Sequence, residues 1–237
     1  MTGSTVTMDH GLSRKLILRR YMDLPRLLDL LRSKTLYLRR ADGFHDRLEG
    51  ALFPALRKSL DDAHLRGQNN RNADYFYRRA RTGSFVCCWS IGAKDNMALW
   101  QLYGGTKSSV AVTTTVERLM KVAISWAESA LIHRVKYVDH LRVRNWIIGR
   151  YTDVLHYKND AYRYEKELRL IIPRQGETWE SNPMGIRLPL PNLSDLIRSV
   201  VVAPESEPWF LEGVRDLCNK YKLAAPVRQS KLAVVPK

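Results

Sequence analysis

The sequence predicts one mixed α+β domain with a central β-sheet flanked by helices. Short runs rich in Val, Ile, Leu and aromatic residues alternate with longer stretches in which apolar residues recur at helical spacing. This alternation lacks the regular strand–helix–strand rhythm of a parallel sheet, which favours the mixed class. A chain of 237 residues is long enough for one domain with a sizeable core. We therefore expect a disordered N-terminal tail at residues 1–13 and a single domain at residues 14–237.

Strands are predicted where β-prone residues alternate in polarity or form short apolar runs. The run at 84–90 is almost free of polar residues, which is typical of a central strand that is buried on both faces. The predicted strands lie at residues 15–21, 35–39, 84–90, 108–114, 132–138, 162–172, 185–190, 199–203 and 226–232.

Helices are predicted from apolar residues at helical spacing and from start and stop signals. Asp23 is placed to cap the first helix, because Pro25 suits its first turn and leucines follow at helical spacing. Gly104 and Gly105 are stop signals for another helix. The predicted helices lie at residues 24–31, 54–66, 70–81, 96–103, 116–130, 141–157 and 208–221.

The chain is strongly basic, with a formal net charge of +15. Between Arg14 and Arg81 there are 17 Lys and Arg residues against 8 Asp and Glu residues. Such an excess either attracts a polyanion, such as nucleic acid or a nucleotide pyrophosphate, or simply keeps the surface soluble. Charge alone does not decide between these two readings.

Composition also limits the cellular setting. The three cysteines, of which Cys87 and Cys88 are adjacent, form neither a disulfide framework nor a zinc ligand set. No apolar run approaches the length of a membrane span, and the N-terminus lacks an apolar stretch of the signal-peptide type. We therefore expect a cytoplasmic protein with no membrane partner.

The most informative stretch is residues 162–172, which contains Glu165, Glu167 and Arg169. If it forms a strand, these three side chains lie on one face and mostly apolar residues lie on the other. Two carboxylates separated by one two-residue step, roughly 7 Å, raise the pKa of at least one of them unless a cation or a metal lies nearby. The row is either the solvated face of an amphipathic strand or a reactive site.

Several motifs in the same order resemble the family called domain of unknown function 2971, from about Leu16 to Gln229. They are Arg20-Tyr21-Met22, Leu36-Tyr37, Asp46 with Glu49-Gly50, Cys88-Trp89-Ser90, Met97 to Tyr103, Val135-Lys136-Tyr137, Glu165 to Arg169 and Val201 to Pro204. The chain departs from the family pattern at Arg47, where a proline usually follows the aspartate, and at Tyr162, where a tryptophan is common. Neither departure removes a candidate catalytic group, and the family name implies no activity.

A remoter resemblance, to the ADP-ribosyltransferase fold, does imply an activity. The opening strand with a basic residue and a tyrosine, the middle strand with Ser90 and the late Glu-x-Glu are similar to the Arg–Ser–Glu triad of that fold. The resemblance implies a split central sheet, with NAD as a substrate and no metal. Glu167 would stabilise the oxocarbenium-like cation that forms when nicotinamide leaves, and Glu165 would accept a proton from the attacking nucleophile.

The same resemblance implies the binding residues. Arg20 would clamp the pyrophosphate or the nicotinamide ribose, and Ser90 would orient that ribose or Glu167. Trp100 and Tyr103, three residues apart on one helix, form either a core aromatic pair or a platform for a nicotinamide or adenine ring. The remaining expected substrate-binding residues are Tyr21, Asp46, Glu49 and Arg169. The acceptor could be water, as in an NAD glycohydrolase, or a protein, a nucleic acid or a small molecule.

Two rival functions remain open. A non-catalytic module could bind a nucleotide or nucleic acid, and either this module or the transferase would suit a bacterial toxin or defence system. A metal-dependent nuclease could place Asp46, Glu49, Glu165 and Glu167 around Mg²⁺. A nuclease strand of this kind usually carries Glu-x-Lys, and the third residue here is Glu167, which counts against the nuclease.

Overall fold

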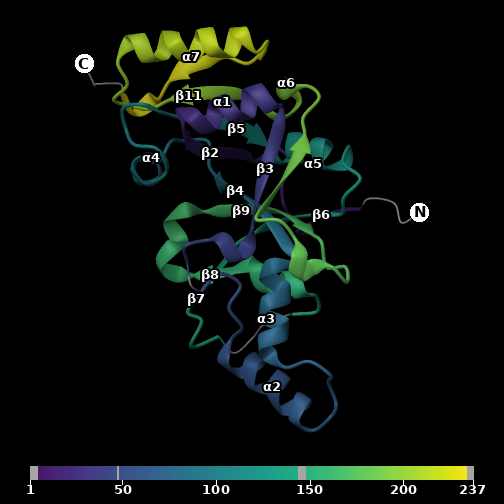
Figure 1. Ribbon diagram of the computed structural model, residues 1–237. Helices are drawn as coiled ribbons and strands as arrows, with labels where there is room; N and C mark the ends of the chain where they lie inside the picture. Colours follow the sequence, from purple (N-terminus) through teal and green to yellow (C-terminus); the bar gives the residue numbers. More distant parts are fainter. Residues whose placement is uncertain (1–4, 47, 144–147, 234–237) are drawn as a thin grey trace.

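The computed structural model describes residues 5–46, 48–143 and 148–233. Ten of its strands form one mixed sheet, whose main path runs β1-β6-β9-β4-β2-β5-β11-β12 (Figure 1). Strand β10 pairs with β3, and β3 pairs with β4. The strands of this sheet are β1 (Val6–Met8), β2 (Ile17–Asp23), β3 (Thr35–Arg40), β4 (Ser84–Ile91), β5 (Ser109–Thr115), β6 (Ala130–Arg134), β9 (Glu167–Pro173), β10 (Gly185–Pro189), β11 (Ser199–Val202) and β12 (Val227–Gln229).

The sheet is split at β4. One edge of β4 pairs with β9 along its whole length, from Ser84 to Ser90. Its other edge is shared, because residues 90–91 pair with β2 and residues 85–86 pair with β3. The two neighbours therefore diverge from a common strand. This confirms the prediction of a mixed α+β domain built on a split central sheet.

One face of the sheet carries the main apolar core. Leucines and valines from the strands pack there against four helices, and Leu18, Met22 and Leu170 are among the buried side chains. Asp23 caps the first of these helices by accepting a hydrogen bond from the Arg26 backbone N–H at 2.9 Å, as predicted. The four helices are α1 (Leu24–Ser33), α5 (Val116–Ile124), α6 (Leu193–Leu196) and α7 (Pro208–Lys220).

The opposite face carries two smaller apolar clusters. Helix α4 (Met97–Tyr103) packs Leu99 and Trp100 against one half of the sheet. One end of helix α3 (Ala73–Thr82) and short 3₁₀ segments cover the other half, and helix α2 (Pro54–Leu65) packs against α3. The short 3₁₀ helices are η1 (Ala41–Gly43), η2 (Tyr151–His156), η3 (Asp160–Glu165), η4 (Trp179–Ser181) and η5 (Lys231–Ala233), and a separate two-stranded sheet is formed by β7 (Lys136–Val138) and β8 (Tyr157–Asn159). Polar strand residues lie between the two clusters.

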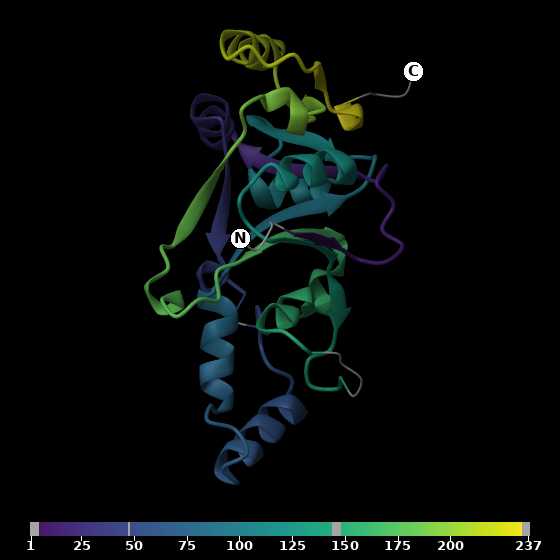
Figure 2. The ribbon, with the colours of Figure 1, turned by 90° about the vertical axis from the view of Figure 1, so that its right-hand side faces the viewer.

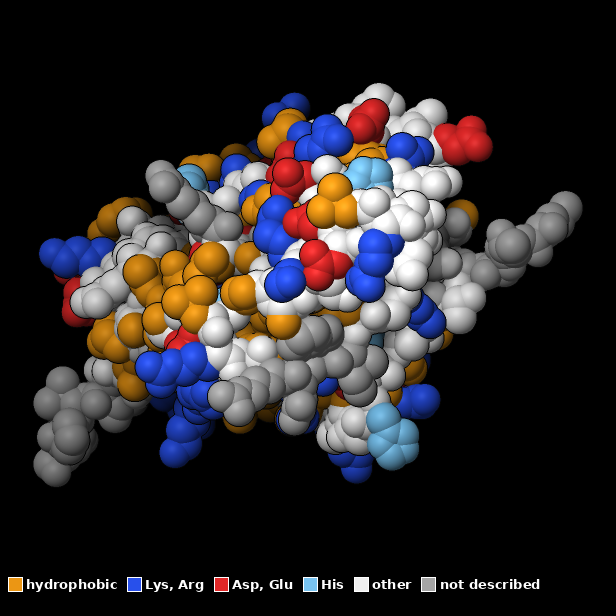
Figure 3. Space-filling view, turned by 90° about the horizontal axis from the view of Figure 1, so that it is seen from below, with side chains coloured by type: hydrophobic (Ala, Val, Ile, Leu, Met, Phe, Trp, Pro, Cys, Tyr) orange, Lys and Arg blue, Asp and Glu red, His pale blue; other side chains and the backbone are white. Residues whose placement is uncertain are grey.

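Helices α2 and α3 extend away from the body of the molecule (Figure 2). Much of the basic charge predicted here is used within the protein, because Arg71, Arg79 and Arg81 lie over tyrosine rings at 4.4, 4.6 and 4.9 Å. Seen from below, basic side chains lie among acidic and hydrophobic ones and do not form one continuous patch on this face (Figure 3). On this face, the excess of basic residues between Arg14 and Arg81 therefore does not form a uniform basic surface.

Several predicted elements differ in the structure. The helix expected at 116–130 ends at Ile124, and the strand expected at 132–138 is divided between β6 and β7, which belong to different sheets. The expected loose tail contains β1, which pairs in parallel with β6, and Leu12 is buried in the core. The expected helix at 141–157 is replaced by turns, η2 and the first residue of β8, with residues 144–147 outside the described part of the chain. The expected strand at 162–172 begins only at Glu167, because the preceding residues form η3 and Lys166 adopts a left-handed conformation (φ 47°).

The adjacent cysteines Cys87 and Cys88 lie on opposite faces of the sheet, and Cys87 is buried in the main core. Among the described residues, no helix combines the length and the apolar character that crossing a membrane requires.

Candidate active site

A row of three polar residues crosses the middle of the sheet. Arg19 on β2 lies opposite Ser90 on β4, and Ser90 lies opposite Glu167 on β9. Directly opposed residues on neighbouring strands point to the same face, and two strand spacings separate Arg19 from Glu167 by about 10 Å. The strand pairing thus aligns an arginine, a serine and a glutamate on one surface.

The arginine in this row is Arg19, and not Arg20 as expected. Side chains alternate along a strand, so Arg20 lies on the face that carries Leu18 and Met22. Burial raises the pKa of the Cys87 thiol on that face, and the charge of Arg20 partly offsets this rise. Arg20 therefore does not lie on the face that carries Glu167, where the clamp expected from the resemblance would have to be. Arg19 is buried, with its guanidinium 3.0 Å from the Asp95 carboxylate.

Glu167 is held by Arg169, the next residue on the same face of β9. The Arg169 Nε donates to Glu167 Oε1 at 2.8 Å, and its two terminal nitrogens contact both oxygens of Glu49. Arg169 also donates to the Leu155 carbonyl at 2.6 Å, so all five of its N–H groups have acceptors. Gly50 (φ +67°) lets the chain turn directly after Glu49. Arg169 and Glu49 therefore brace the site and have no group left for substrate.

Glu165 reaches the same site by a different route. Lys158 donates to Glu165 at 2.5 Å and to Glu167 at 3.1 Å, so a cation bridges the two carboxylates. Tyr103 donates its hydroxyl to the other Glu165 oxygen at 2.8 Å. The Ser90 hydroxyl donates to the Glu165 backbone carbonyl at 2.7 Å and fixes the segment before β9.

The charges in this cluster control one another. Burial alone would raise the pKa of Glu167, but Arg169 and Lys158 outweigh burial and hold that pKa well below its usual value. Burial raises the pKa of Glu49, and Arg169 only partly offsets it. Burial opposes the charge on Lys158, yet Glu167 and Glu165 raise its pKa. Glu167 is therefore ionised at neutral pH, as a group that stabilises a cation must be.

Tyrosines surround the carboxylate pair. Tyr137 accepts a hydrogen bond from the Glu167 backbone N–H at 2.7 Å, and burial together with the two carboxylates raises its pKa to about 12. The Tyr162 ring lies 4.7 Å from the Lys158 ammonium. Tyr103 and Tyr164 are 41% and 39% exposed, so their rings form an accessible rim beside the buried carboxylates.

Three expected binding residues have structural roles. Trp100 is fully buried and packs edge-on against Tyr21, with ring centroids 4.9 Å apart, so it is a core residue and not a free platform. The Tyr21 hydroxyl accepts from the Asn96 backbone N–H at 3.0 Å at the start of α4. Asp46 accepts from the Leu48 backbone N–H at 2.9 Å and so shapes the turn before Glu49.

The metal site that the rival nuclease function would need is not assembled among the described residues. Glu49 and Glu167 both face Arg169, and Lys158 already occupies the space between Glu167 and Glu165. A divalent ion would have to displace these cations. Within residues 5–46, 48–143 and 148–233, no group of three or more His, Cys, Asp or Glu residues is arranged to hold a metal ion.

Two stacked histidines lie beside this cluster. His133 is opposite Arg169 on the neighbouring strand, and its ring stacks on His156 with centroids 4.0 Å apart. Asp9 contacts the His133 Nδ1 at 2.5 Å. Burial, and then the neighbouring His133, lowers the pKa of His156 to about 4. His156 therefore stays neutral in the folded protein across most of the acidic range.

We expect the free energy of unfolding to fall as the pH drops from 6.5 to about 4, because unfolded His156 titrates near 6.5. The stability that neutral His156 contributes is fully present above pH 6.5 and is lost as the pH falls to about 4. The total loss is on the order of 3 kcal/mol. His156→Phe keeps a stacked ring without a titrating group and should flatten the profile measured by urea denaturation. A residual slope is expected from His140, whose pKa burial also lowers. An unchanged slope in His156→Phe would contradict the assignment.

Comparisons with known proteins give a distant structural likeness. No protein-family model and no curated protein matches the chain, so the resemblance to domain of unknown function 2971 has no matching model. Among solved structures, the chain is similar to Thermus sp. 2.9 DarT in complex with NAD+, at 9% identity and a TM-score of 0.46 over 94% of this chain and 99% of that chain. It is also similar to the same protein in complex with ADP-ribosylated ssDNA, at 10% identity and a TM-score of 0.44 over 95% and 98% of the two chains. A TM-score below 0.5 does not establish a shared fold, so we take none of the site chemistry from these proteins.

Proposed function

We propose that this protein is an NAD-dependent ADP-ribosyltransferase-like enzyme or an NAD glycohydrolase. The observation that carries the proposal is the in-register row of Arg19, Ser90 and Glu167 across β2, β4 and β9. It contains the three residue types of the Arg–Ser–Glu triad, and Glu165 joins it through Ser90 and Lys158. Arg19 takes the place that the sequence suggested for Arg20.

The cluster suits a reaction that develops positive charge. Three carboxylates surround two cations, and Glu167 remains ionised although it is only 4% exposed. In the proposed reaction the C–N bond between nicotinamide and ribose breaks, and its electron pair leaves with the nicotinamide nitrogen. Glu167 stabilises the cation left at the ribose carbon, a nucleophile attacks that carbon, and Glu165 accepts the nucleophile's proton.

Substrate has to replace part of the present hydrogen bonding. Lys158 lies closer to Glu165 (2.5 Å) than to Glu167 (3.1 Å). A ribose hydroxyl can replace the longer contact while Lys158 stays on Glu165, which leaves that Glu167 oxygen with the hydroxyl and the 3.3 Å bond from Arg169. The exposed ring of Tyr103 is then placed to meet the nicotinamide, since a tyrosine face attracts a cationic ring.

The pyrophosphate needs a cation other than Arg20. A hollow of about 330 Å³ lies at the ends of β2 and β4 and is lined by Lys15, Ile91 and Ala93. The Ile91 backbone N–H donates a hydrogen bond to the carbonyl of Lys166, the residue between the two glutamates. The Ala93 carbonyl accepts a hydrogen bond from the Arg19 guanidinium. The hollow therefore lies at the strand ends, next to the backbone of the row, and we assign Lys15 as the phosphate contact.

Incubation of the purified protein with NAD tests the proposal. Release of nicotinamide should proceed in the presence of EDTA, and labelled ADP-ribose should appear on an acceptor if single-stranded nucleic acid or a protein extract supplies one. Release without an acceptor identifies a glycohydrolase. The absence of both release and transfer would contradict the proposal.

The rival function is a non-catalytic nucleotide- or nucleic-acid-binding module. It is favoured by the closed state of the cluster, in which both oxygens of Glu165 and of Glu167 accept hydrogen bonds from protein groups. In that case NAD or nucleic acid should bind without turnover. The same incubation, with binding measured in parallel, separates the two functions.

A further inference from the structure

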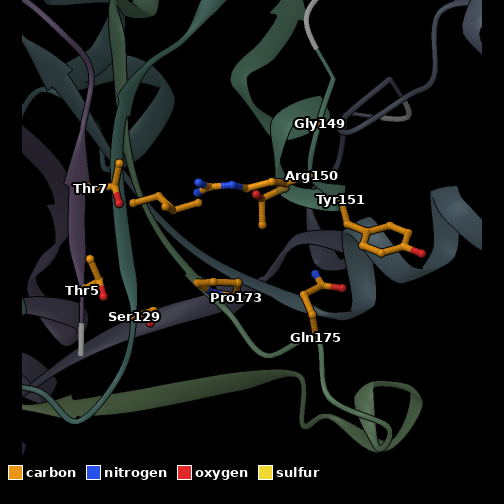
Figure 4. Close-up of a pocket in the computed structure, with 10 residues that line it drawn as sticks. Thr5, Thr7, Ser129, Gly149, Arg150, Tyr151, Pro173 and Gln175 are labelled. Atoms are coloured by element: carbon orange, nitrogen blue, oxygen red, sulfur yellow. The ribbon is translucent and has the colours of Figure 1, made fainter. Parts of the chain in front are cut away.

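A second hollow, of about 540 Å³, opens on the sheet face that carries Glu167, but at the far end of β9 (Figure 4). Thr7 on β1 and Ser129 before β6 lie on one side, and Arg150 and Gln175 come from the other, near Tyr151 (Figure 4). Thr152 also lines the hollow. Pro173 ends β9 at this hollow, six residues after Glu167. A strand covers roughly 20 Å over that length, so the hollow is separate from the carboxylate cluster.

Arg150 supplies an unused cation. Its side chain extends across the hollow toward the strand that carries Thr7 (Figure 4). The nearby Asp153 carboxylate accepts hydrogen bonds from the backbone N–H groups of Gly149 and Arg150, both at 2.8 Å, and does not pair with the Arg150 guanidinium. Within the described part of the chain, no residue pairs with the Arg150 guanidinium, and none of the residues that line the hollow is acidic. Arg150 is exposed, so its guanidinium is free to pair with an anion that enters the hollow.

Two further polar groups in the lining lack partners. Thr152 is 3% exposed, and its hydroxyl makes no hydrogen bond to any described residue. Gln175 donates its amide N–H groups to the Gly83 carbonyl at 2.9 Å and to the Ser84 hydroxyl at 3.1 Å, but its Oε1 is buried without a donor among the same residues. Buried polar groups are rarely left unpaired, so each one indicates a missing partner. A carbonyl oxygen needs a donor, which a phosphate cannot supply and a sugar hydroxyl can.

We propose that this hollow binds a phosphate monoester carried on a ribose-sized polyol, with the phosphate on Arg150 and sugar hydroxyls on Gln175 and Thr152. Its volume lies within the range of small-molecule sites. The apolar surfaces of Leu131 and Pro173 complete the lining and suit the face of an attached ring. Such a ligand is either a free nucleoside monophosphate or the 5′-phosphorylated end of a nucleic acid strand.

Calorimetric titration of the full-length protein with AMP, adenosine and a 5′-phosphorylated oligonucleotide tests the site. AMP should bind, and adenosine should bind at least about tenfold more weakly because it lacks the charged group. Arg150→Gln should weaken AMP binding by a similar factor. Arg228→Gln is the matched control, because Arg228 is an exposed arginine on β12, at the opposite edge of the sheet.

Thr152→Val separates ligand binding from a structural role. The hydroxyl has no hydrogen-bond partner among the described residues, so its removal should leave the melting temperature unchanged or higher while weakening AMP binding several-fold. Glu167→Gln should not change AMP binding, which keeps this proposal independent of the NAD reaction. Binding of the oligonucleotide without AMP would assign the site to a strand end and still support it. The proposal is overturned if neither ligand binds, or if binding survives Arg150→Gln or is lost only in Glu167→Gln.

Discussion

Replacing Arg169 with methionine is expected to lower the free energy of unfolding by about 3–5 kcal/mol, the cost of breaking a buried ion pair from one side. Arg169 is 1% exposed and donates all five of its hydrogen bonds within the protein. Without it, the carboxylates of Glu49 and Glu167 face each other with no cation between them. Urea denaturation at pH 7 measures the loss.

Arg187→Met is the matched control for this loss. Arg187 pairs with a single carboxylate, that of Asp29, at 2.8 Å, and the two side chains are 47% and 48% exposed. An exposed pair of this kind contributes only about 0–1 kcal/mol. Combining Arg169→Met with Glu49→Gln should recover part of the stability, because one stranded charge is removed. An equal loss in Arg169→Met and Arg187→Met would show that the buried cluster contributes nothing special.

The pH dependence gives a second check on the Arg169 variant. In the native protein, Arg169 is the main group that holds the pKa of Glu167 down. Without it, burial dominates and raises the pKa of both Glu167 and Glu49, so the folded variant takes up protons more readily than the unfolded chain. The stability difference between native protein and variant should therefore shrink as the pH falls from 7 to 5.

The fold was largely predictable because its signals are local. The run at 84–90 did form the central strand β4, and α1 did begin after its Asp23 cap. The misses have non-local causes. Val6–Met8 becomes a strand only because β6 offers a free edge, and the expected strand at 162–172 is shortened because Lys166 adopts a left-handed conformation that its side chain does not announce.

The sequence gives only a partial signal for the choice between the two arginines. Leu16, Leu18 and Met22 share the phase of Arg20 on the strand, whereas Ile17 and Tyr21 share that of Arg19, so the period-two rule favours the core face for Arg20 by a small margin. The rule leaves Arg19 for the other face, where the structure finds it opposite Ser90. The error came from following the motif Arg20-Tyr21-Met22 in place of the phase of the strand.

Lys158 carried no comparable signal. It was expected in no site, and its neighbours 141–157 were expected to be helical. It reaches the carboxylates because β8 pairs with β7 and places it beside β9, a contact set by tertiary structure. The Lys158 bridge also explains how the carboxylates of Glu165 and Glu167 can lie close together. From the sequence, one could infer only that some cation had to lie near them.

In the NAD assay, Glu167→Gln is expected to reduce turnover by roughly 10²–10³, the scale seen when one electrostatic stabiliser is removed. The side chain keeps its size but loses its charge, which matters most when the ribose carries positive charge. NAD affinity should change little. Glu165→Gln should behave differently, because it removes the proton acceptor: NAD hydrolysis should persist while transfer to an acceptor is blocked.

Stability has to be separated from catalysis in this experiment, because Glu167→Gln also removes the negative charge with which Arg169 and Lys158 pair. Glu49→Gln is the matched control: it is the same substitution, on the same Arg169, at a residue that is 1% exposed against 4% for Glu167. Both variants should lose stability, since each leaves Arg169 with one anion fewer. Only Glu167→Gln should lose activity per folded molecule by two orders of magnitude or more, because Glu49 lies behind Arg169 and outside the row of Arg19, Ser90 and Glu167. Equal activity losses in the two variants would assign both carboxylates to the support of the fold, and the row would then have no catalytic role.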